Sequence, residues 1–388
     1  MESRRILVTC PKACSSYLKE ELEELGFLIE GEVATGVFTR GSREDCVKLN
    51  LSLRTGLRVL WEIGNFEARN GDALYRQAVQ MEWEKWIPKD GYVSIISSVS
   101  NDSVKHTNYP NLKLKDALVD HMRKATGSRP DTGNDPSKAV VFLYWRDEEV
   151  CVYLDTSGTP LSNRGYRVSP AKAPMRENLA ASVIRATSWD RHTTFVNPMC
   201  GSGTLAIEAA QLALGMPAGV LRDNFAFMHL RDYDASSFER LRKEQRENSK
   251  TDLGFEILAS DKDPKAIEAA KRNAKIARVD HLIRFETRDF RQATIPQEPG
   301  VIILNPEYGE RLGDEKKLIS TYQEIGDLFK RKAPGYWGYV FTGNRNLGKR
   351  VGLKAKRRIE FYNGPIECRL LEYELYSGTR DPRRSEKG

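Results

Sequence analysis

The sequence predicts an α/β fold with a parallel, doubly wound sheet in its C-terminal part, preceded by an α+β part. Three observations support this fold class. Apolar strand-like runs alternate with helix-forming runs after Met175, a glycine-rich turn joins one strand to a helix, and acidic or amide residues follow the next strands. Because ligands of such sheets bind beyond the carboxyl ends of the strands, these residues are the first candidates for a functional site.

Length and composition limit the classes of protein that fit. A chain of 388 residues is long for one core, so two or three domains are expected. No apolar run approaches the length of a membrane span, and the first ten residues contain no signal-like stretch, so we expect a cytoplasmic protein. The six cysteines are scattered and the five histidines are not suitably spaced, which predicts reduced thiols and no metal site.

The net charge of +7 is unevenly distributed along the chain. Residues 1–150 carry 21 Lys+Arg against 23 Asp+Glu, whereas residues 151–388 carry 40 against 31. The basic excess therefore belongs to the part that contains the glycine-rich turn. It suits a polyanionic partner such as nucleic acid, although such an excess is also common among proteins that bind none.

The first 65 residues predict a small ferredoxin-like unit, because strand-like and helix-like runs follow one another there as β-α-β-β-α-β. Further strands and helices follow up to residue 157. The last two strands, at 139–147 and 148–158, have alternating apolar residues and predict a hairpin-like pair.

The stretch FVNPMCGSGTLAIEAA, residues 195–210, predicts a ligand site at a strand-to-helix turn. Gly201 and Gly203 lie where a side chain would obstruct a ligand, and the helix that starts at Thr204 directs its N-terminus at the same place. A phosphate-binding P-loop does not fit, because no lysine lies between residues 193 and 210. The dinucleotide fingerprint is weakened but not excluded, since Ala206 stands where its third glycine is expected.

Acidic residues follow the next two strands. Asp261 either holds ribose hydroxyls or caps the following helix, whereas Asp263 is expected to be the cap. The interval of 58 residues between Gly203 and Asp261 exceeds the roughly 20 that such folds usually have, so we expect an inserted loop and a charged helix between them. Asp289 is a candidate for the amino group of an adenine, or else a surface loop residue.

The stretch VIILNPEYGERLG, residues 301–313, ends a third apolar strand in Asn305 and Pro306. The Asn305 amide oxygen and the Pro306 carbonyl can each accept a hydrogen bond from an exocyclic amine. Tyr308 offers a ring on which a flipped-out base can stack. An Asn-Pro turn with a packing tyrosine is the commoner explanation of this motif alone. Its combination with the glycine turn and Asp261 favours chemistry on a base amine.

Here the sequence resembles a known family. NPMCGSGTLAIEAA, ASDKDP and NPEYGERLG resemble the S-adenosylmethionine (SAM), nucleotide and amine motifs of class I N-methyltransferases that act on RNA guanine. The stretches at 154–184, 226–230 and 361–375 resemble the RlmL-type guanine-N2 methyltransferases of 23S rRNA and their YpsC-like relatives. The resemblance covers nearly the whole chain and corresponds to the form with a single methyltransferase.

The resemblance implies a Rossmann-like class I methyltransferase domain at 165–380, preceded by a ferredoxin-like segment at 1–65 and a THUMP RNA-binding domain at 66–157. Residues 381–388 are expected to be a disordered tail. It further implies SAM as cofactor and RNA as partner, with rRNA first and tRNA as the main alternative.

The resemblance also implies the site residues. Those implied to bind the cofactor are Pro174, Glu177, Asn197, Cys200, Gly201, Ser202, Gly203, Thr204, Asp261, Asp289 and Asn305. Those implied to hold the base and to carry the catalysis are Asn305, Pro306 and Tyr308.

One departure from the family leaves alternatives open. Glu307 stands where relatives usually have a second proline. The glutamate has no effect on activity, or it shapes the guanine pocket, or it marks an altered substrate or a lost activity. The competing functions are an RNA-binding protein with a decayed enzymatic domain, a DNA adenine-N6 methyltransferase and, last, an NAD-linked oxidoreductase. The RNA-type front part argues against the DNA enzyme.

Overall fold

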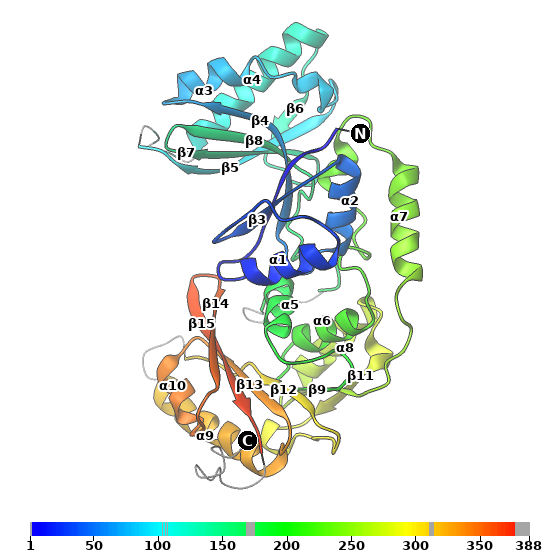
Figure 1. Ribbon diagram of the computed structural model, residues 1–388, viewed down its shortest axis with the longest axis vertical. Coiled ribbons are helices and arrows are strands. Elements are labelled where there is room, and N and C mark those ends of the chain that lie inside the picture. The colour runs from blue at the N-terminus through cyan, green and yellow to red at the C-terminus, as the bar shows by residue number, and fades with distance from the viewer. Residues whose placement is uncertain are drawn as a thin grey trace. The chain divides into compact units, whose positions relative to one another are not determined.

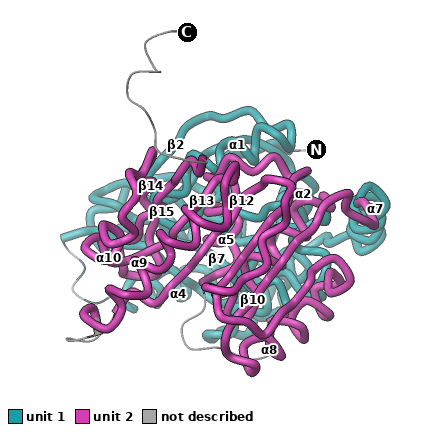
Figure 2. Tube along the Cα trace, turned by 90° about the horizontal axis from the view of Figure 1, so that it is seen from below, with its two compact units in different colours: residues 1–165, 216–249 teal, residues 166–215, 250–388 magenta. Residues whose placement is uncertain are grey.

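The computed structural model describes residues 2–102, 104, 106, 108–167, 175–309 and 314–376, so Pro174 and the tail at 381–388 lie outside the described residues. The chain forms two compact units (Figure 2). Unit 1 comprises Met1–Gly165 and Met216–Ser249, and unit 2 comprises Tyr166–Gly215 and Lys250–Gly388. None of the helices within the described ranges is long and apolar enough to cross a membrane.

Unit 1 begins with the predicted β-α-β-β-α-β order (Figure 1). Its first elements are β1 (Arg4–Thr9), α1 (Ser15–Glu24), β2 (Gly31–Val33), β3 (Gly36–Gly41), α2 (Arg43–Ser52) and β4 (Arg58–Glu67). The next are α3 (Gly71–Ala78), β5 (Tyr92–Ser100), α4 (Asn108–Thr126), β6 (Asp131–Gly133), β7 (Ala139–Arg146) and β8 (Glu149–Asp155). The two last strands form the expected antiparallel hairpin.

One eight-stranded sheet runs through unit 1, in the order β2-β3-β1-β4-β8-β7-β5-β6. The ten-residue strand β4 joins its two halves. Its first residues pair with β1, and from Leu60 onward it pairs with β8, with a register shift between Glu62 and Gly64. A bulge of this kind bends a strand and increases its twist. The ferredoxin-like and THUMP-like parts therefore share one backbone ladder.

Residues 216–249, which interrupt the sequence of unit 2, complete unit 1. They contain the predicted charged helix, α7 (Ala235–Glu247), and the short 3₁₀ helix η2 (Ala226–His229). The Gly219 N–H donates to Leu51 O (2.7 Å), and the Phe227 N–H donates to Thr156 O (3.0 Å). The two chain segments of unit 2 that flank the insertion are neighbours, because the Lys250 N–H donates to Leu214 O (2.8 Å).

Arg222 fixes the insertion to the segment after β8. Its guanidinium donates to the carbonyls of Ser157 (3.2 Å) and Thr159 (3.0 Å) and lies over the ring of Phe225. Arg222 is buried, and desolvation lowers its pKa to about 10. Buried guanidinium groups are costly unless their N–H donors are paired, so these bonds specify one position for the insertion.

Unit 2 is a doubly wound α/β domain (Figure 1). Its strands are β9 (Thr194–Pro198), β10 (Ile257–Asp261), β11 (Ile283–Thr287), β12 (Gly300–Leu304), β13 (Trp337–Thr342), β14 (Arg357–Asn363) and β15 (Ile366–Glu374). Its helices are α5 (Glu177–Arg185), α6 (Thr204–Ala213), α8 (Pro264–Ile276), α9 (Asp314–Lys332) and α10 (Arg345–Arg350).

The strand order is β11-β10-β9-β12-β13-β15-β14. The strands β11 to β13 in this order are parallel, and β15 is antiparallel to both of its neighbours. Helices α5, α6 and α8 lie on one face, and α9 and α10 lie on the other (Figure 1). The parallel strands therefore place Pro198, Asp261 and Leu304 at one edge of the sheet.

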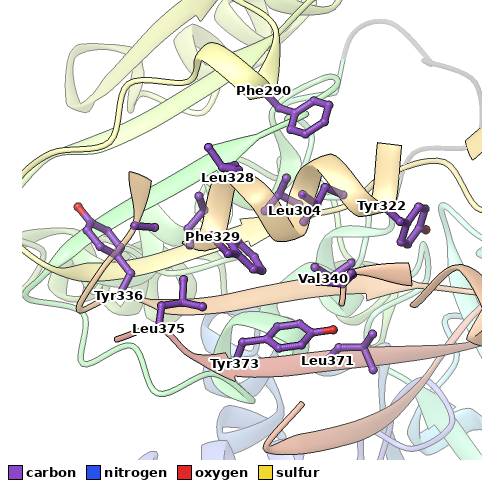
Figure 3. Packing of buried hydrophobic residues seen from close by; sticks show 14 of the residues in the cluster. Phe290, Leu304, Tyr322, Leu328, Phe329, Tyr336, Val340, Leu371, Tyr373 and Leu375 are labelled. Atoms are coloured by element: carbon purple, nitrogen blue, oxygen red, sulfur yellow. The ribbon is translucent and has the colours of Figure 1, made fainter. Parts of the chain in front are cut away.

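The core under α9 shows how the sheet is held (Figure 3). Leu328 and Phe329 of α9 pack with Leu304 of β12, Val340 of β13 and Tyr373 of β15, all of them buried. Each fully buried large apolar side chain contributes about 1.5–3 kcal/mol relative to its exposure. This packing fixes the end of β12 and hence the loop that starts at Asn305.

Candidate functional site

The turn after β9 adopts backbone angles that favour glycine. Gly201 and Gly203 have φ of 54° and 85°, and Met199 shares this left-handed region at 62°. A Cβ at position 203 would lie 3.0 Å from the Cβ of Ala270 on α8, so the turn packs closely there. A Cβ at position 201 would meet nothing within 4 Å. The turn is therefore tight on one side and open on the other.

The N-terminus of α6 faces this turn. Its N-cap is Gly203, and no side chain caps the helix there. The first N–H groups of a helix carry a partial positive charge and bind anionic or polar acceptors. The turn itself is anchored from α8, because Asn273 Nδ2 donates to Ser202 O (3.0 Å).

Asp261 connects the end of β10 to the glycine turn. The Gly201 N–H donates to its Oδ2 (3.0 Å), and the Asp263 N–H donates to its Oδ1 (3.0 Å). Each carboxylate oxygen has a second acceptor position, so the group can still accept hydrogen bonds from hydroxyl groups. The helix cap is Asp263, as predicted, since its side chain accepts from the Lys265 N–H. Capping is thus not the function of Asp261.

Asp289 lies beyond the end of β11. Its carboxylate accepts from the Arg291 N–H (3.0 Å) and from Arg291 Nε and Nη2 (2.8 and 2.9 Å). The hydrogen bond from the Arg291 side chain lowers the pKa of Asp289. A backbone bond from the Arg288 N–H to Asp261 O (2.9 Å) ties this strand end to that of β10.

Asn197 is fully buried near the end of β9. Its Nδ2 donates to Ile303 O (2.9 Å) on the neighbouring strand β12. Its Oδ1 is buried and has no hydrogen-bond partner among the residues that the structure describes. Because a buried carbonyl oxygen without a donor is unfavourable, this oxygen is a candidate acceptor for a ligand N–H.

The thiols at the site are not activated. All six cysteines are buried, and none of them forms a disulfide. Burial raises the pKa of Cys200 and also that of Cys368. A nucleophilic cysteine needs a lowered pKa, so neither thiol has the properties of a nucleophile. Within the described ranges, no group of three His, Cys, Asp or Glu residues is placed to hold a metal ion.

Glu177, at the start of α5, forms a buried ion pair that the sequence did not predict. Arg167 Nε donates to Glu177 Oε1 (3.0 Å), and Arg167 Nη2 donates to Thr204 Oγ1 (3.3 Å). Burial raises the pKa of Glu177, and the charge of Arg167 opposes that rise. Glu177 is thereby linked, through Arg167, to the first residue of α6.

The loop after β12 is held from two sides. The Tyr308 hydroxyl donates to Asn305 Oδ1 (2.9 Å), and Tyr322 on α9 donates to Glu307 O (3.2 Å). Asn344 Nδ2 donates to Tyr308 O (3.3 Å). Pro306 is buried, whereas the side chain of Glu307 is exposed. This loop keeps Asn305 half-buried at the carboxyl edge of the sheet.

The structure joins several of the predicted site residues, or the strands that carry them, through hydrogen bonds. Asp261 contacts the glycine turn, Asn197 contacts β12, and Asn305 contacts Tyr308. The fold defines a class I methyltransferase domain that follows ferredoxin-like and THUMP domains in the sequence.

Family models agree with this class. Residues 164–372 match the RMKL-like methyltransferase domain, which is more than half of the chain, so the chain belongs to that family. Residues 5–60 match the RlmL ferredoxin-like domain, and residues 68–155 match the THUMP domain.

Relatives by sequence carry names of RNA enzymes. The chain is 32% identical over 381 residues to a ribosomal RNA large subunit methyltransferase K/L from Syntrophotalea carbinolica, covering 96% of this chain and 53% of the relative. It thus spans about half the length of the first curated relatives it matches. A candidate RNA methyltransferase of Synechocystis is 30% identical, with 96% and 97% covered.

Solved structures of similar proteins share the architecture over nearly the full chain. A candidate methyltransferase complexed with SAH has a TM-score of 0.87 at 26% identity, covering 98% of this chain and 100% of that one. A protein from Listeria monocytogenes titled a predicted N6-adenine-specific DNA methylase has a TM-score of 0.88 at 28% identity, with 97% of each covered.

Proposed function

We propose that this protein transfers a methyl group from SAM to the exocyclic N2 amine of a guanine in 23S rRNA. The observation that carries the proposal is the loop at Asn305 and Pro306, which follows a strand that is hydrogen-bonded to the strand of the glycine turn. The names of the relatives support RNA, and rRNA in particular. The choice of guanine N2 rests on the resemblance of the three motifs.

The residues present fit SAM. Among the described residues, nothing lies above Gly201 within 4 Å of a Cβ placed there, no side chain caps the N-terminus of α6, and no group donates to Asn197 Oδ1. We propose that the turn residues 197–204 bind the methionine end, that Asp261 binds the ribose and that Asp289 binds the adenine. Pro174 belongs to the proposed cofactor segment by resemblance only.

SAM, when bound, supplies the electrophilic methyl group. Asn305 Oδ1 and Pro306 O would each accept a hydrogen bond from one N–H of the guanine amine and so orient its lone pair, which is otherwise delocalised into the ring. The Tyr308 hydroxyl already donates to Asn305 Oδ1, so it fixes the amide orientation while one acceptor position remains. The raised pKa of Cys200 agrees with direct transfer that has no covalent enzyme intermediate.

The front part of the chain is proposed to position RNA. We propose domain limits of 1–65 for the ferredoxin-like segment, 66–157 for the THUMP domain and 165–380 for the methyltransferase domain. All proposed catalytic residues follow residue 170, which motivates this division of labour.

The test is to incubate the protein with labelled SAM and three substrates: 23S rRNA fragments, tRNA transcripts and duplex DNA. Digestion to nucleosides and mass spectrometry then identify the product. N2-methylguanosine in 23S rRNA supports the proposal. Finding the same nucleoside in tRNA alone, or N6-methyladenine in DNA, would contradict the proposed substrate and identify another one. Cofactor binding without any transfer would instead fit an RNA-binding protein whose enzymatic domain has decayed.

A further inference from the structure

One guanidinium nitrogen of Arg167 has no acceptor among the described residues. Its side chain is only 18% exposed. Nε donates to Glu177, and Nη2 donates to Met175 O (3.0 Å) and to Thr204 Oγ1 (3.3 Å). Nη1 is buried and has no hydrogen-bond partner in the described part of the chain. Three bonds thus fix the guanidinium plane while one pair of N–H donors is left over.

A buried, unpaired donor on a charged group is unfavourable, so a site of this kind is usually completed by an acceptor. The guanidinium fork matches carboxylate geometry better than any other side chain does. Arg167 contacts Thr204, the first residue of α6, whose uncapped N-terminus also favours a negative group. Two sources of positive potential therefore meet at the end of the glycine turn.

The other end of the turn offers the opposite chemistry. Asn197 is fully buried, and its Oδ1 has no donor among the residues that the structure describes. An unpaired donor on the α6 side and an unpaired acceptor on the β9 side suit a ligand that carries both a carboxylate and an ammonium group. The amino-acid end of SAM is such a group.

We propose that Arg167 Nη1 binds the α-carboxylate of SAM and that Glu177 is a positioning residue that holds the Arg167 guanidinium. This inference rests on the proposed function, because it requires SAM as cofactor. It adds a binding residue outside the glycine turn, and it gives Glu177 an indirect role, since its own carboxylate would repel that of SAM.

The experiment compares SAM with decarboxylated SAM, which lacks only the α-carboxylate. Both are titrated by calorimetry into the full chain and into Arg167→Gln. We expect Arg167→Gln to lower SAM affinity by about 10- to 100-fold, the range for one charge-assisted hydrogen bond. Affinity for decarboxylated SAM should change less than threefold. Glu177→Gln should reduce the preference for SAM in the same direction but by less.

Two further variants keep the test decisive. Arg176→Gln removes an exposed arginine from the same segment and should leave both affinities unchanged. Arg167→Lys keeps the charge but not the fork, so it should lose part of the preference for SAM. It also serves if Arg167→Gln does not fold.

The outcomes separate the two proposals. If the wild-type chain binds neither SAM nor SAH, the proposed cofactor is wrong and the inference falls with it. If the wild type binds SAM, but Arg167→Gln and Arg167→Lys weaken SAM and decarboxylated SAM equally, Arg167 is structural and the inference alone is overturned.

Discussion

The Asp261 carboxylate accepts a hydrogen bond from the glycine turn and is also the proposed acceptor for the ribose hydroxyls. Asp261→Ala removes the acceptor for the Gly201 N–H as well as that for a ribose hydroxyl. We therefore expect SAM affinity to fall by about 1.5–3 kcal/mol, the value for hydrogen bonds to a charged group. Calorimetric titration measures this loss.

Asp263 provides the matched control. Asp263→Ala removes the cap of α8 and should cost about 1 kcal/mol of stability. It should not change SAM affinity. Equal affinities for Asp261→Ala and the parent protein would show that Asp261 does not hold the cofactor.

Asn305 and Tyr308 can be tested separately because one hydrogen bond joins them. Asn305→Ala removes an acceptor for the amine, so turnover should fall by roughly 10² or more while SAM affinity stays the same. Tyr308→Ala should weaken RNA binding by about 1–3 kcal/mol, because the base loses the ring on which it stacks. Tyr308→Phe keeps the ring and removes only the bond to Asn305, so it should lower turnover and leave RNA affinity intact.

Glu307→Pro restores the residue that is common in relatives. Since the Glu307 side chain is exposed, we expect activity to stay within a few-fold of the parent protein. Single-turnover methyl transfer to RNA measures all four variants. Full transfer by Asn305→Ala would show that this loop does not hold the amine.

The candidate site residues differ in how strongly the sequence points to them. Gly201, Gly203 and Asp261 stand at strand ends in a fixed order, so local pattern sufficed to propose them. The sequence did not point to Arg167, because an arginine before a proline-containing stretch is indistinguishable from a solvated one. Its contacts with Glu177 and Thr204 depend on the tertiary fold.

Helix α9 contains Gly326 at a position where close packing leaves no room for a side chain. A Cβ at Gly326 would lie 1.9 Å from Val351 O, next to the end of α10. Alanine is the better helix former by about 1 kcal/mol, but here it would force the backbones apart. We expect Gly326→Ala to lower the free energy of unfolding by about 1–3 kcal/mol.

Gly254 gives the comparison, because a Cβ there would meet nothing within 4 Å. Gly254→Ala should be neutral or stabilise by about 0.4–1 kcal/mol. Urea denaturation of both variants measures the difference. A neutral Gly326→Ala would mean that α9 and α10 can move apart without cost.

Element types were predicted more completely than their pairing. The charged helix α7 was expected from the long interval between Gly203 and Asp261, and the hairpin β7–β8 from alternating apolar residues. The three-residue strands β2 and β6 were not identified individually, since so few residues show no alternation. The role of β4 in both halves of the sheet was also not predicted, because long-range pairing leaves no local signal.

At the scale of the whole molecule, the insertion at 216–249 decides which fragments can fold. Phe225, Phe227 and Phe238 are buried within unit 1. A fragment of residues 160–388 would expose them and should aggregate. Residues 166–388 with 216–249 replaced by a few glycines should instead fold, because Leu214 and Lys250 are hydrogen-bonded neighbours.

The glycine-linked fragment should bind SAM within a few-fold of the full chain and lose most affinity for structured RNA. Calorimetry and RNA titration at matched salt measure both, because phosphate contacts depend strongly on salt. RNA binding as tight as that of the full chain would show that the front part does not position RNA.

The interrupted chain of unit 1 also has a consequence on the ribosome. The last residues of unit 1 are translated 84 residues after Gly165, which takes about 4–17 s at typical elongation rates. During that interval the nascent chain has an eight-stranded sheet without the segment that covers part of it. Unit 1 is therefore started first but finished only after β9 and α6 of unit 2 have been synthesised, and chaperones would meet an incomplete unit 1 in every round of translation.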